Sequence, residues 1–118
     1  QATFFTATDG NHGRGVAWTA RELGCRAVVR MPRGTVDSRV RNIRALGAEV
    51  SVENMNYDAC VRLAAQQARE TPGGVLVQDT AWEGYTQIPM WIMQGYLTMA
   101  LEADEQMDAL IAALKQIL

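Results

Sequence analysis

Apolar residues along the chain follow two alternating spacings, which predict strands and helices in turn. Short β-prone runs predict four strands, at residues 2–7, 26–31, 48–52 and 75–77. Helical spacing follows each run and predicts helices at residues 16–23, 36–46, 57–69 and from about residue 89 towards the end. Because a helix follows every strand, the pattern predicts an α/β fold: an open, mainly parallel four-stranded sheet with helices on both faces, plus a C-terminal helix.

Residues 1–118 are expected to form a single α/β domain, because no interior stretch is rich enough in proline, glycine or serine to mark a linker. Residues 108–118 are almost wholly helix-forming, and their apolar positions form a stripe: Leu110, Ile111, Leu114, Ile117 and Leu118. This stripe could cover the sheet, pair with another chain, or belong to an interface with sequence outside this chain. Packing against the sheet is the interpretation that we favour.

Composition narrows the class of protein without naming a function. The chain has 20% charged residues and a net charge of -2, which indicates neither a nucleic-acid surface nor an acidic tail. No apolar run approaches the roughly 20 residues that cross a bilayer, and the first residues lack the order of a secretory leader. We therefore expect a soluble, cytoplasmic protein with no nucleic-acid or membrane partner. Cys25 and Cys60 lack redox or metal-binding spacing and are interpreted as small buried hydrophobic residues, and no metal site is expected.

The segment Thr8-Asp9-Gly10-Asn11-His12-Gly13-Arg14-Gly15 joins the first predicted strand to the first predicted helix. The carboxyl edge of a parallel sheet is where α/β proteins bind ligands, and a helix amino end there offers backbone N–H groups to anions. The glycine order differs from the dinucleotide fingerprint, and Arg30 and Met31 stand where an acidic residue would bind a ribose. The loop could instead hold a flat polar ligand with its carboxylate, amide and imidazole groups.

Further motifs accompany this segment: Met55-Asn56-Tyr57-Asp58, Gln78-Asp79-Thr80-Ala81-Trp82-Glu83-Gly84-Tyr85, and Ile88-Pro89 with Trp91-Ile92-Met93-Gln94-Gly95-Tyr96. Together with residues 8–18, they resemble diaminopropionate ammonia-lyase, a family of the fold-type II pyridoxal phosphate enzymes. The resemblance covers residues 1 to about 107 and implies a chain equivalent to the small domain of such an enzyme. Residues 108–118 lie outside it. Aspartate at position 9, where the wider group usually has serine, is specific to this lyase.

The resemblance implies pyridoxal 5'-phosphate as cofactor and a small amino acid as substrate. The implied reaction is α,β-elimination of ammonia from 2,3-diaminopropionate, which gives pyruvate and a second ammonia. Asn11 would hydrogen-bond the phenolic oxygen of the cofactor ring, with Gly10 and His12 beside it in the cofactor-binding loop. Asp9 would take the α-proton of the D isomer, and Asp79 would hold the substrate amine or assist its departure. Both carboxylates follow parallel strands, so we expect them at one edge of the sheet, facing one pocket.

These residues also have structural interpretations. Asp9 could cap the first helix, and Asn11 could hold a turn in the left-handed conformation. His12, the single histidine of the sequence, is interpreted as a structural hydrogen-bonding residue rather than a base. The aromatic residues of the later motifs are interpreted as core or interface residues rather than stacking partners of substrate: Trp82, Tyr85, Trp91 and Tyr96.

The chain departs from this family by lacking the lysine that holds the cofactor as a Schiff base. Its one lysine, Lys115, lies in the terminal helix outside every matching motif, and the glycine-rich phosphate cup is also missing. We therefore expect the chain alone to be inactive and to depend on a large domain, with a homo-oligomer as a further partner arrangement. Two other interpretations stay open: an isolated non-catalytic α/β module that binds a small anion or a partner, and an assembly element built on the terminal helix.

Overall fold

Residues 1–117 are described by the computed structural model, which divides the chain into two compact units, Gln1–Gln78 and Asp79–Leu118. Leu118, the last residue of the predicted apolar stripe, lies outside the described residues. The four strands and first three helices belong to the first unit, and the fourth helix belongs to the second. The assignment of residues 1–118 to a single domain stays a prediction.

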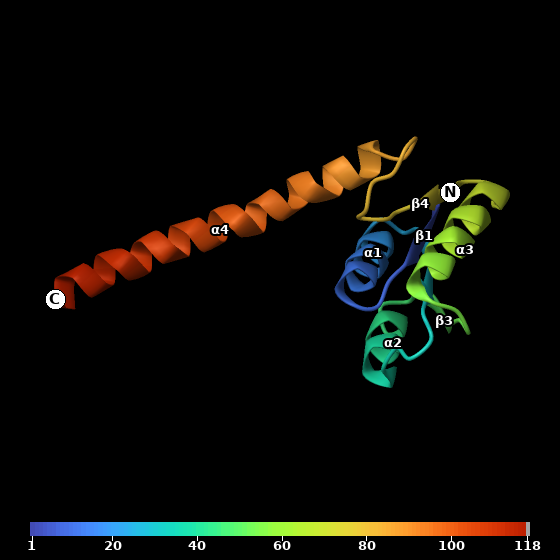
Figure 1. The fold of residues 1–118 in the computed structure, drawn as a ribbon, viewed down its shortest axis with the longest axis horizontal. Helices are drawn as coiled ribbons and strands as arrows, with labels where there is room; N and C mark the ends of the chain where they lie inside the picture. Colours follow the sequence, from blue (N-terminus) through green and yellow to red (C-terminus); the bar gives the residue numbers. More distant parts are fainter. Residues whose placement is uncertain (118) are drawn as a thin grey trace. The chain divides into compact units, whose positions relative to one another are not determined.

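The first unit is a four-stranded parallel sheet with helices between its strands (Figure 1). Its elements are, in chain order, β1 (Thr3–Ala7), α1 (Asn11–Glu22), β2 (Arg26–Met31), α2 (Asp37–Arg44), β3 (Glu49–Val52), α3 (Tyr57–Glu70) and β4 (Gly74–Leu76). The strand order is β3-β2-β1-β4, and each pair of neighbours runs parallel. The predicted α/β fold is confirmed. Strand β1 lies inside the sheet, next to β4, which forms one edge.

Alternate side chains of the strands point to opposite faces of the sheet and form two separate cores. On one face, Phe5 and Val28 pack against α3. On the other face, Val29, Met31 and Val50 pack against α1 and α2. Figure 1 shows α3 on one side of the sheet and α1 and α2 on the other. Helices on both faces, expected from the order of elements, are thus confirmed.

Helix α1 begins at Asn11, well before residue 16, where the apolar spacing predicts its start. Gly13 and Gly15 lie in its first turns, and glycine disfavours helix in an isolated chain. Tertiary contacts outweigh that preference, because Gly13, Val16 and Ala17 are all buried by the packing of α1 on the rest of the unit. The Thr8-Asp9-Gly10-Asn11-His12-Gly13-Arg14-Gly15 segment is therefore half loop and half helix.

The second unit consists of an aromatic turn and one long helix, α4 (Gln87–Ile117). Trp82 and Tyr85 exchange two backbone hydrogen bonds, of 3.1 and 2.9 Å, and their rings stack with centroids 4.4 Å apart. Gly84 adopts φ 81° in this turn, a conformation that favours glycine. The turn presents the two rings as one stacked pair.

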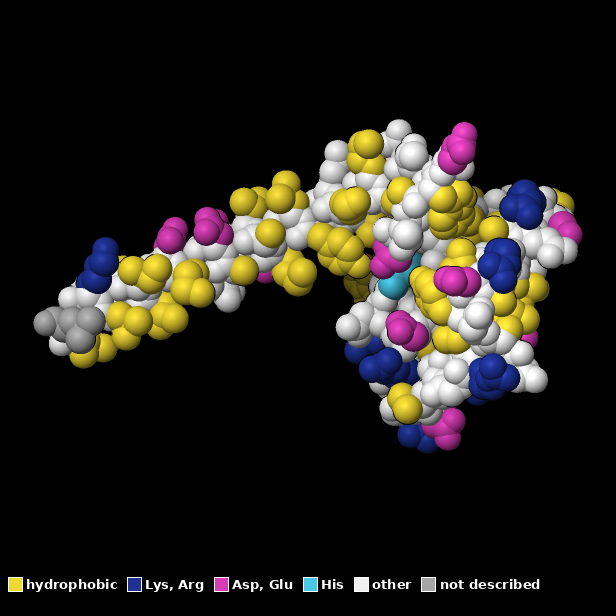
Figure 2. Space-filling model, viewed as in Figure 1, with side chains coloured by type: hydrophobic (Ala, Val, Ile, Leu, Met, Phe, Trp, Pro, Cys, Tyr) yellow, Lys and Arg dark blue, Asp and Glu magenta, His cyan; other side chains and the backbone are white. Residues whose placement is uncertain are grey.

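Large hydrophobic side chains run along α4 and remain exposed (Figure 2). The predicted apolar stripe is among them, and its described members are Leu110, Ile111, Leu114 and Ile117. No described element of the second unit covers them, so the partner of the stripe stays a prediction. Within residues 1–117, no helix combines the length and apolarity needed to cross a membrane.

The two cysteines are both free thiols in different surroundings. Cys60 is a buried residue of α3, and burial raises the pKa of its thiol, with the negative charge of Glu53 adding to the rise. Cys25 is half-buried. The interpretation as a buried hydrophobic residue is confirmed for Cys60 and is wrong for Cys25, which follows the end of α1 where the chain returns to the surface.

Candidate active site

Thr8 fixes the loop between β1 and α1. Its buried hydroxyl oxygen accepts hydrogen bonds from the backbone N–H groups of Gly10 and Gly13, each at 3.0 Å. These are donors that the first turn of a helix leaves without a partner inside the helix. Thr8 therefore caps α1, and the alternative interpretation of Asp9 as the cap is wrong.

Gly13 allows α1 to approach this cap closely. A Cβ at Gly13 would overlap Cγ2 of Thr8 and would lie 3.2 Å from Cδ1 of Ile43 in α2. The helix could not keep its place against both neighbours with any larger residue there. The glycine thus sets the position of the amino end of α1.

Asp9 lies between these two anchors and is exposed. Its backbone carbonyl accepts a hydrogen bond of 2.9 Å from Nη1 of Arg39, which ties the loop to α2. Its carboxylate takes part in no hydrogen bond or ion pair with residues that the structure describes. The loop therefore holds the backbone of Asp9 while leaving the carboxylate available for chemistry.

Gly10 and Asn11 form the junction with α1. Asn11 is the exposed first residue of the helix, and among the described residues none except glycine has a positive φ. The interpretation of Asn11 as a left-handed turn residue is therefore wrong. A Cβ at Gly10 would make ordinary contact with Arg39, at 3.6 Å from its Cδ, so this glycine is not required by packing.

His12 connects α1 with the end of β4. Its Nε2 lies 2.8 Å from the backbone carbonyl oxygen of Val77. Because a carbonyl oxygen can only accept, Nε2 carries the proton in this contact. The half-buried imidazole makes the structural hydrogen bond that our interpretation of it predicts.

Gln78 is a buried residue at the same edge of the sheet, and the sequence reading did not single it out. Its Oε1 accepts hydrogen bonds from Ala7 N and Thr6 Oγ1, both at 2.6 Å, and its Nε2 lies 3.2 Å from the hydroxyl of Tyr57. The signal available in the sequence was a polar residue directly after a strand. The partners of Gln78, however, are 71, 72 and 21 positions away along the chain. Spacing alone could not have found them.

Asp79 follows Gln78 directly and is the first residue of the second unit. It is half-buried and has an interaction partner. Asp9 and Gly10 lie in the loop after β1, and Asn11 and His12 follow in the first turn of α1. The convergence of Asp79 with them stays a prediction.

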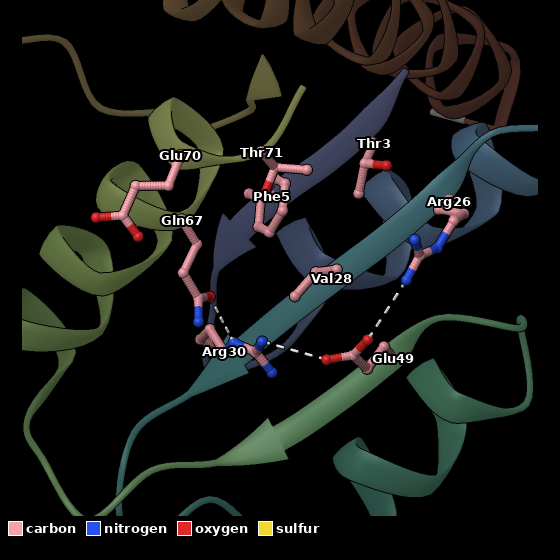
Figure 3. A pocket seen from close by; sticks show the side chains of 9 residues that line it. All are labelled: Thr3, Phe5, Arg26, Val28, Arg30, Glu49, Gln67, Glu70 and Thr71. Atoms are coloured by element: carbon pink, nitrogen blue, oxygen red, sulfur yellow. Dashed lines mark hydrogen bonds and ion pairs between the residues drawn. The ribbon is translucent and has the colours of Figure 1, made fainter. Parts of the chain in front are cut away.

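A second polar cluster, centred on Arg30 of β2, lies on the α3 face of the sheet (Figure 3). Arg30 donates from Nε to Gln67 at 2.9 Å, from Nη1 to Ser51 at 2.8 Å and from Nη2 to Glu49 at 3.2 Å. Arg30, Gln67 and Glu49 line a pocket of about 250 Å³, which contains none of the predicted site residues. The guanidinium is held by protein acceptors on three sides, which is the pattern of a structural network.

Metal chemistry has no ready site in the part of the chain that the structure describes, because no three His, Cys, Asp or Glu side chains gather in a group there. The site is therefore a loop at the carboxyl edge of a parallel sheet, with an exposed carboxylate and an exposed amide at a helix amino end. Such an edge is where α/β enzymes bind phosphorylated cofactors. A model of the family described as pyridoxal-phosphate dependent enzyme matches residues 1–115, and the chain belongs to this family.

Curated relatives are more specific. The chain is 61% identical over 104 residues to a diaminopropionate ammonia-lyase of Salmonella typhimurium and 62% identical over 105 residues to that of Escherichia coli. These matches cover 88% and 89% of the chain but 26% of each relative, so the chain spans about a quarter of their length. The resemblance seen in the motifs is confirmed. A mitochondrial threonine dehydratase of Schizosaccharomyces pombe is 43% identical over 65 residues.

Solved structures agree with this family. The apo form of the Escherichia coli diaminopropionate ammonia-lyase has a TM-score of 0.88 and 59% identity, with 93% of this chain and 30% of that chain covered. Its complex with D-serine has a TM-score of 0.89 and the same identity, with 93% of this chain and 28% of that chain covered. The fold is that of the corresponding part of a pyridoxal phosphate enzyme.

The residues of the loop fit one side of this cofactor. The Asn11 amide is exposed where a ring oxygen could accept from it, and an amide donates without ionising. The one lysine of the chain, Lys115, lies in α4, near its end. Contact of Asn11 with the cofactor ring stays a prediction, and Lys115 lies outside the loop that carries the predicted site residues.

Proposed function

We propose that this chain is a segment of a pyridoxal phosphate-dependent lyase that eliminates ammonia from 2,3-diaminopropionate and yields pyruvate. The observation that carries the proposal is the 61% identity over 104 residues to a diaminopropionate ammonia-lyase. Because the match covers 26% of that relative, a large domain outside this sequence would supply the anchoring lysine and the phosphate site. The complete protein would be cytoplasmic, and a second copy of it is a further proposed partner.

Asn11 would hold the cofactor ring by donating its amide N–H to the phenolic oxygen. Gly10, which has no side chain, would let the backbone lie close to the ring. His12 would act indirectly, because its hydrogen bond to Val77 holds the first turn of α1. When bound, pyridoxal phosphate supplies an electron sink next to the α-carbon of the substrate. The support from this chain is an exposed amide on a loop that Thr8 and Arg39 hold in place.

Asp9 would act as the base for the D isomer. Its carboxylate has no described partner that would have to be displaced before it accepts a proton. The α-proton moves to the carboxylate, a carbon–carbon double bond forms, and the β carbon–nitrogen bond breaks with its electron pair leaving on ammonia. Asp79 would hold the departing amine. Hydrolysis of the resulting enamine gives pyruvate and the second ammonia.

A second candidate function is that of a non-catalytic assembly module. The observation that favours it is the row of exposed apolar side chains on α4, where Leu114 is 47% and Ile117 is 80% exposed. Size-exclusion chromatography with light scattering on the 118-residue chain tests the assembly module. A monomer would remove the assembly module.

The proposed activity can be tested in a chimera in which this chain replaces the matching 105-residue segment of the Escherichia coli relative. We expect the chimera to bind pyridoxal phosphate and to release ammonia and pyruvate from 2,3-diaminopropionate. The 118-residue chain alone, assayed in parallel, is expected to release neither. A chimera that binds the cofactor but leaves 2,3-diaminopropionate unchanged would contradict the proposed function.

A further inference from the structure

The side chain of Gln78 joins three segments at the carboxyl edge of the sheet. It is fully buried, with 0% of its surface exposed. Its Oε1 lies 2.6 Å from both Ala7 N and Thr6 Oγ1 at the end of β1, and its Nε2 lies 3.2 Å from the Tyr57 hydroxyl at the start of α3. Both atoms at the end of the amide are thus engaged.

These contacts concern the segments that carry the proposed catalytic carboxylates. Ala7 is the last residue of β1 and precedes Asp9 by two positions. Gln78 itself precedes Asp79 by one position. The backbone adds to the link, because Val77 N donates to Phe5 O at 2.8 Å and His12 Nε2 bonds Val77 O at 2.8 Å. The side chain of Gln78 therefore links the segment that precedes Asp9 with the segment that precedes Asp79.

The chemistry of these contacts explains why position 78 carries an amide side chain. Oε1 receives two donors, and Nε2 has to donate to a hydroxyl oxygen, so one end of the side chain accepts while the other donates. A leucine of similar size would bury the Ala7 N–H and the Thr6 hydroxyl without this acceptor. Buried polar groups without partners are costly, and the strand ends would shift to find new partners.

We propose that Gln78 is a positioning residue for the proposed ammonia-lyase reaction, which sets the placement of the segments bearing Asp9 and Asp79. It acts through the ends of β1 and β4 and through Tyr57, and it touches neither substrate nor cofactor. This inference rests on the proposed function. In the motif alone, Gln78 is only one residue of a polar loop, and the inference gives it a role in the reaction.

The test compares Gln78→Leu with Gln67→Leu in the chimeric holoenzyme. Gln67 is the matched control, because it also makes a side-chain hydrogen bond, at 2.9 Å to Arg30, but its partner is a side chain on the α3 face of the sheet rather than the backbone of β1. We expect Gln78→Leu to lower kcat about 100-fold with a smaller change in KM, since small displacements of catalytic groups cost rates of this order. Gln67→Leu is expected to keep kcat within about threefold.

Gln78→Glu adds a readout that a purely structural role would not move. Burial favours the protonated carboxyl, which can still accept from β1 and donate to Tyr57. We therefore expect this variant to recover most of the lost kcat at low pH. As the pH rises the introduced carboxyl ionises and can no longer donate, so its kcat relative to the unsubstituted chimera should fall. Unchanged kcat for both Gln78 variants at every pH would overturn the proposal.

Amide hydrogen exchange tests the same link without any turnover. We expect faster exchange at residues 6–10 in Gln78→Leu and unchanged exchange there in Gln67→Leu. Unchanged exchange at residues 6–10 in both variants would overturn the proposal even in an inactive chimera. Loss of folding in both Gln78 variants would assign the residue to folding and would also overturn it. Inactivity of the unsubstituted chimera, by contrast, counts against the proposed function.

Discussion

Thr8 and Asp9 have separate roles at the start of α1: Thr8 caps the helix, and Asp9 presents an exposed carboxylate. The Thr8 hydroxyl accepts hydrogen bonds from the backbone N–H groups of Gly10 and Gly13, so these donors do not require the Asp9 carboxylate. The Asp9 backbone is held separately by Arg39. The backbone of Asp9 is thereby held while its carboxylate is not used as a cap, which suits the proposed role as proton acceptor.

Gly13 and Gly15 give a matched pair of substitutions at this scale. We expect Gly13→Ala to destabilise the chain by about 1–3 kcal/mol, because its methyl group would overlap Thr8 and crowd Ile43. Gly15→Ala should instead stabilise it by about 0.5–1 kcal/mol, since nothing lies within 4 Å of a Cβ there and alanine favours helix. Urea unfolding of the 118-residue chain measures both. Equal shifts for the two variants would refute this packing account.

The motif allowed the site loop to be placed from sequence, because β-prone residues before it and helical spacing after it mark a strand end. The hydrogen bonds that hold the loop could not be predicted. Gln78 and Ala7 are 71 positions apart, and nothing in either residue type specifies the other as partner. The cap was likewise assigned to Asp9 as an alternative, because serine, threonine and aspartate all cap helices and spacing does not choose among them.

At the scale of elements, the cap of α3 shows where sequence is sufficient. Asparagine is a favoured capping residue, and the Oδ1 of Asn56, directly before α3, accepts from Ala59 N at 2.9 Å. Sequence is sufficient for such a cap because the capping residue and its partner are three positions apart. Helix α1 shows the opposite case, because its first turns contain glycines and are stabilised by contacts with distant residues.

Asn56→Ala should therefore lower the free energy of unfolding by about 1 kcal/mol, the usual cost of losing a side-chain cap. Asn54→Ala is the control, because Asn54 is also exposed and its Oδ1 accepts a hydrogen bond of 3.1 Å from Arg33, but it caps no helix. We expect a smaller change for the control in the same urea titration. A larger loss for Asn54→Ala would contradict the assignment of the cap.

At the scale of the whole molecule, the parallel sheet was predictable because each strand is a short apolar run followed by a helix. The surroundings of α4 were not, because an apolar stripe requires a partner without identifying it. Leu110 and Ile111 remain 53% and 43% exposed. The chain spans about a quarter of the length of the curated diaminopropionate ammonia-lyases that it matches, so the partner of the stripe stays a prediction.

The measurement that tests this account most directly is the isomer preference of Asp9→Asn in the chimera. We predict that kcat/KM for D-2,3-diaminopropionate falls by about 100-fold or more, because the amide cannot accept the α-proton. The value for the L isomer should stay within about threefold, because its proton leaves from the other face. Equal losses for the two isomers would contradict the assignment of Asp9 as the base for the D isomer.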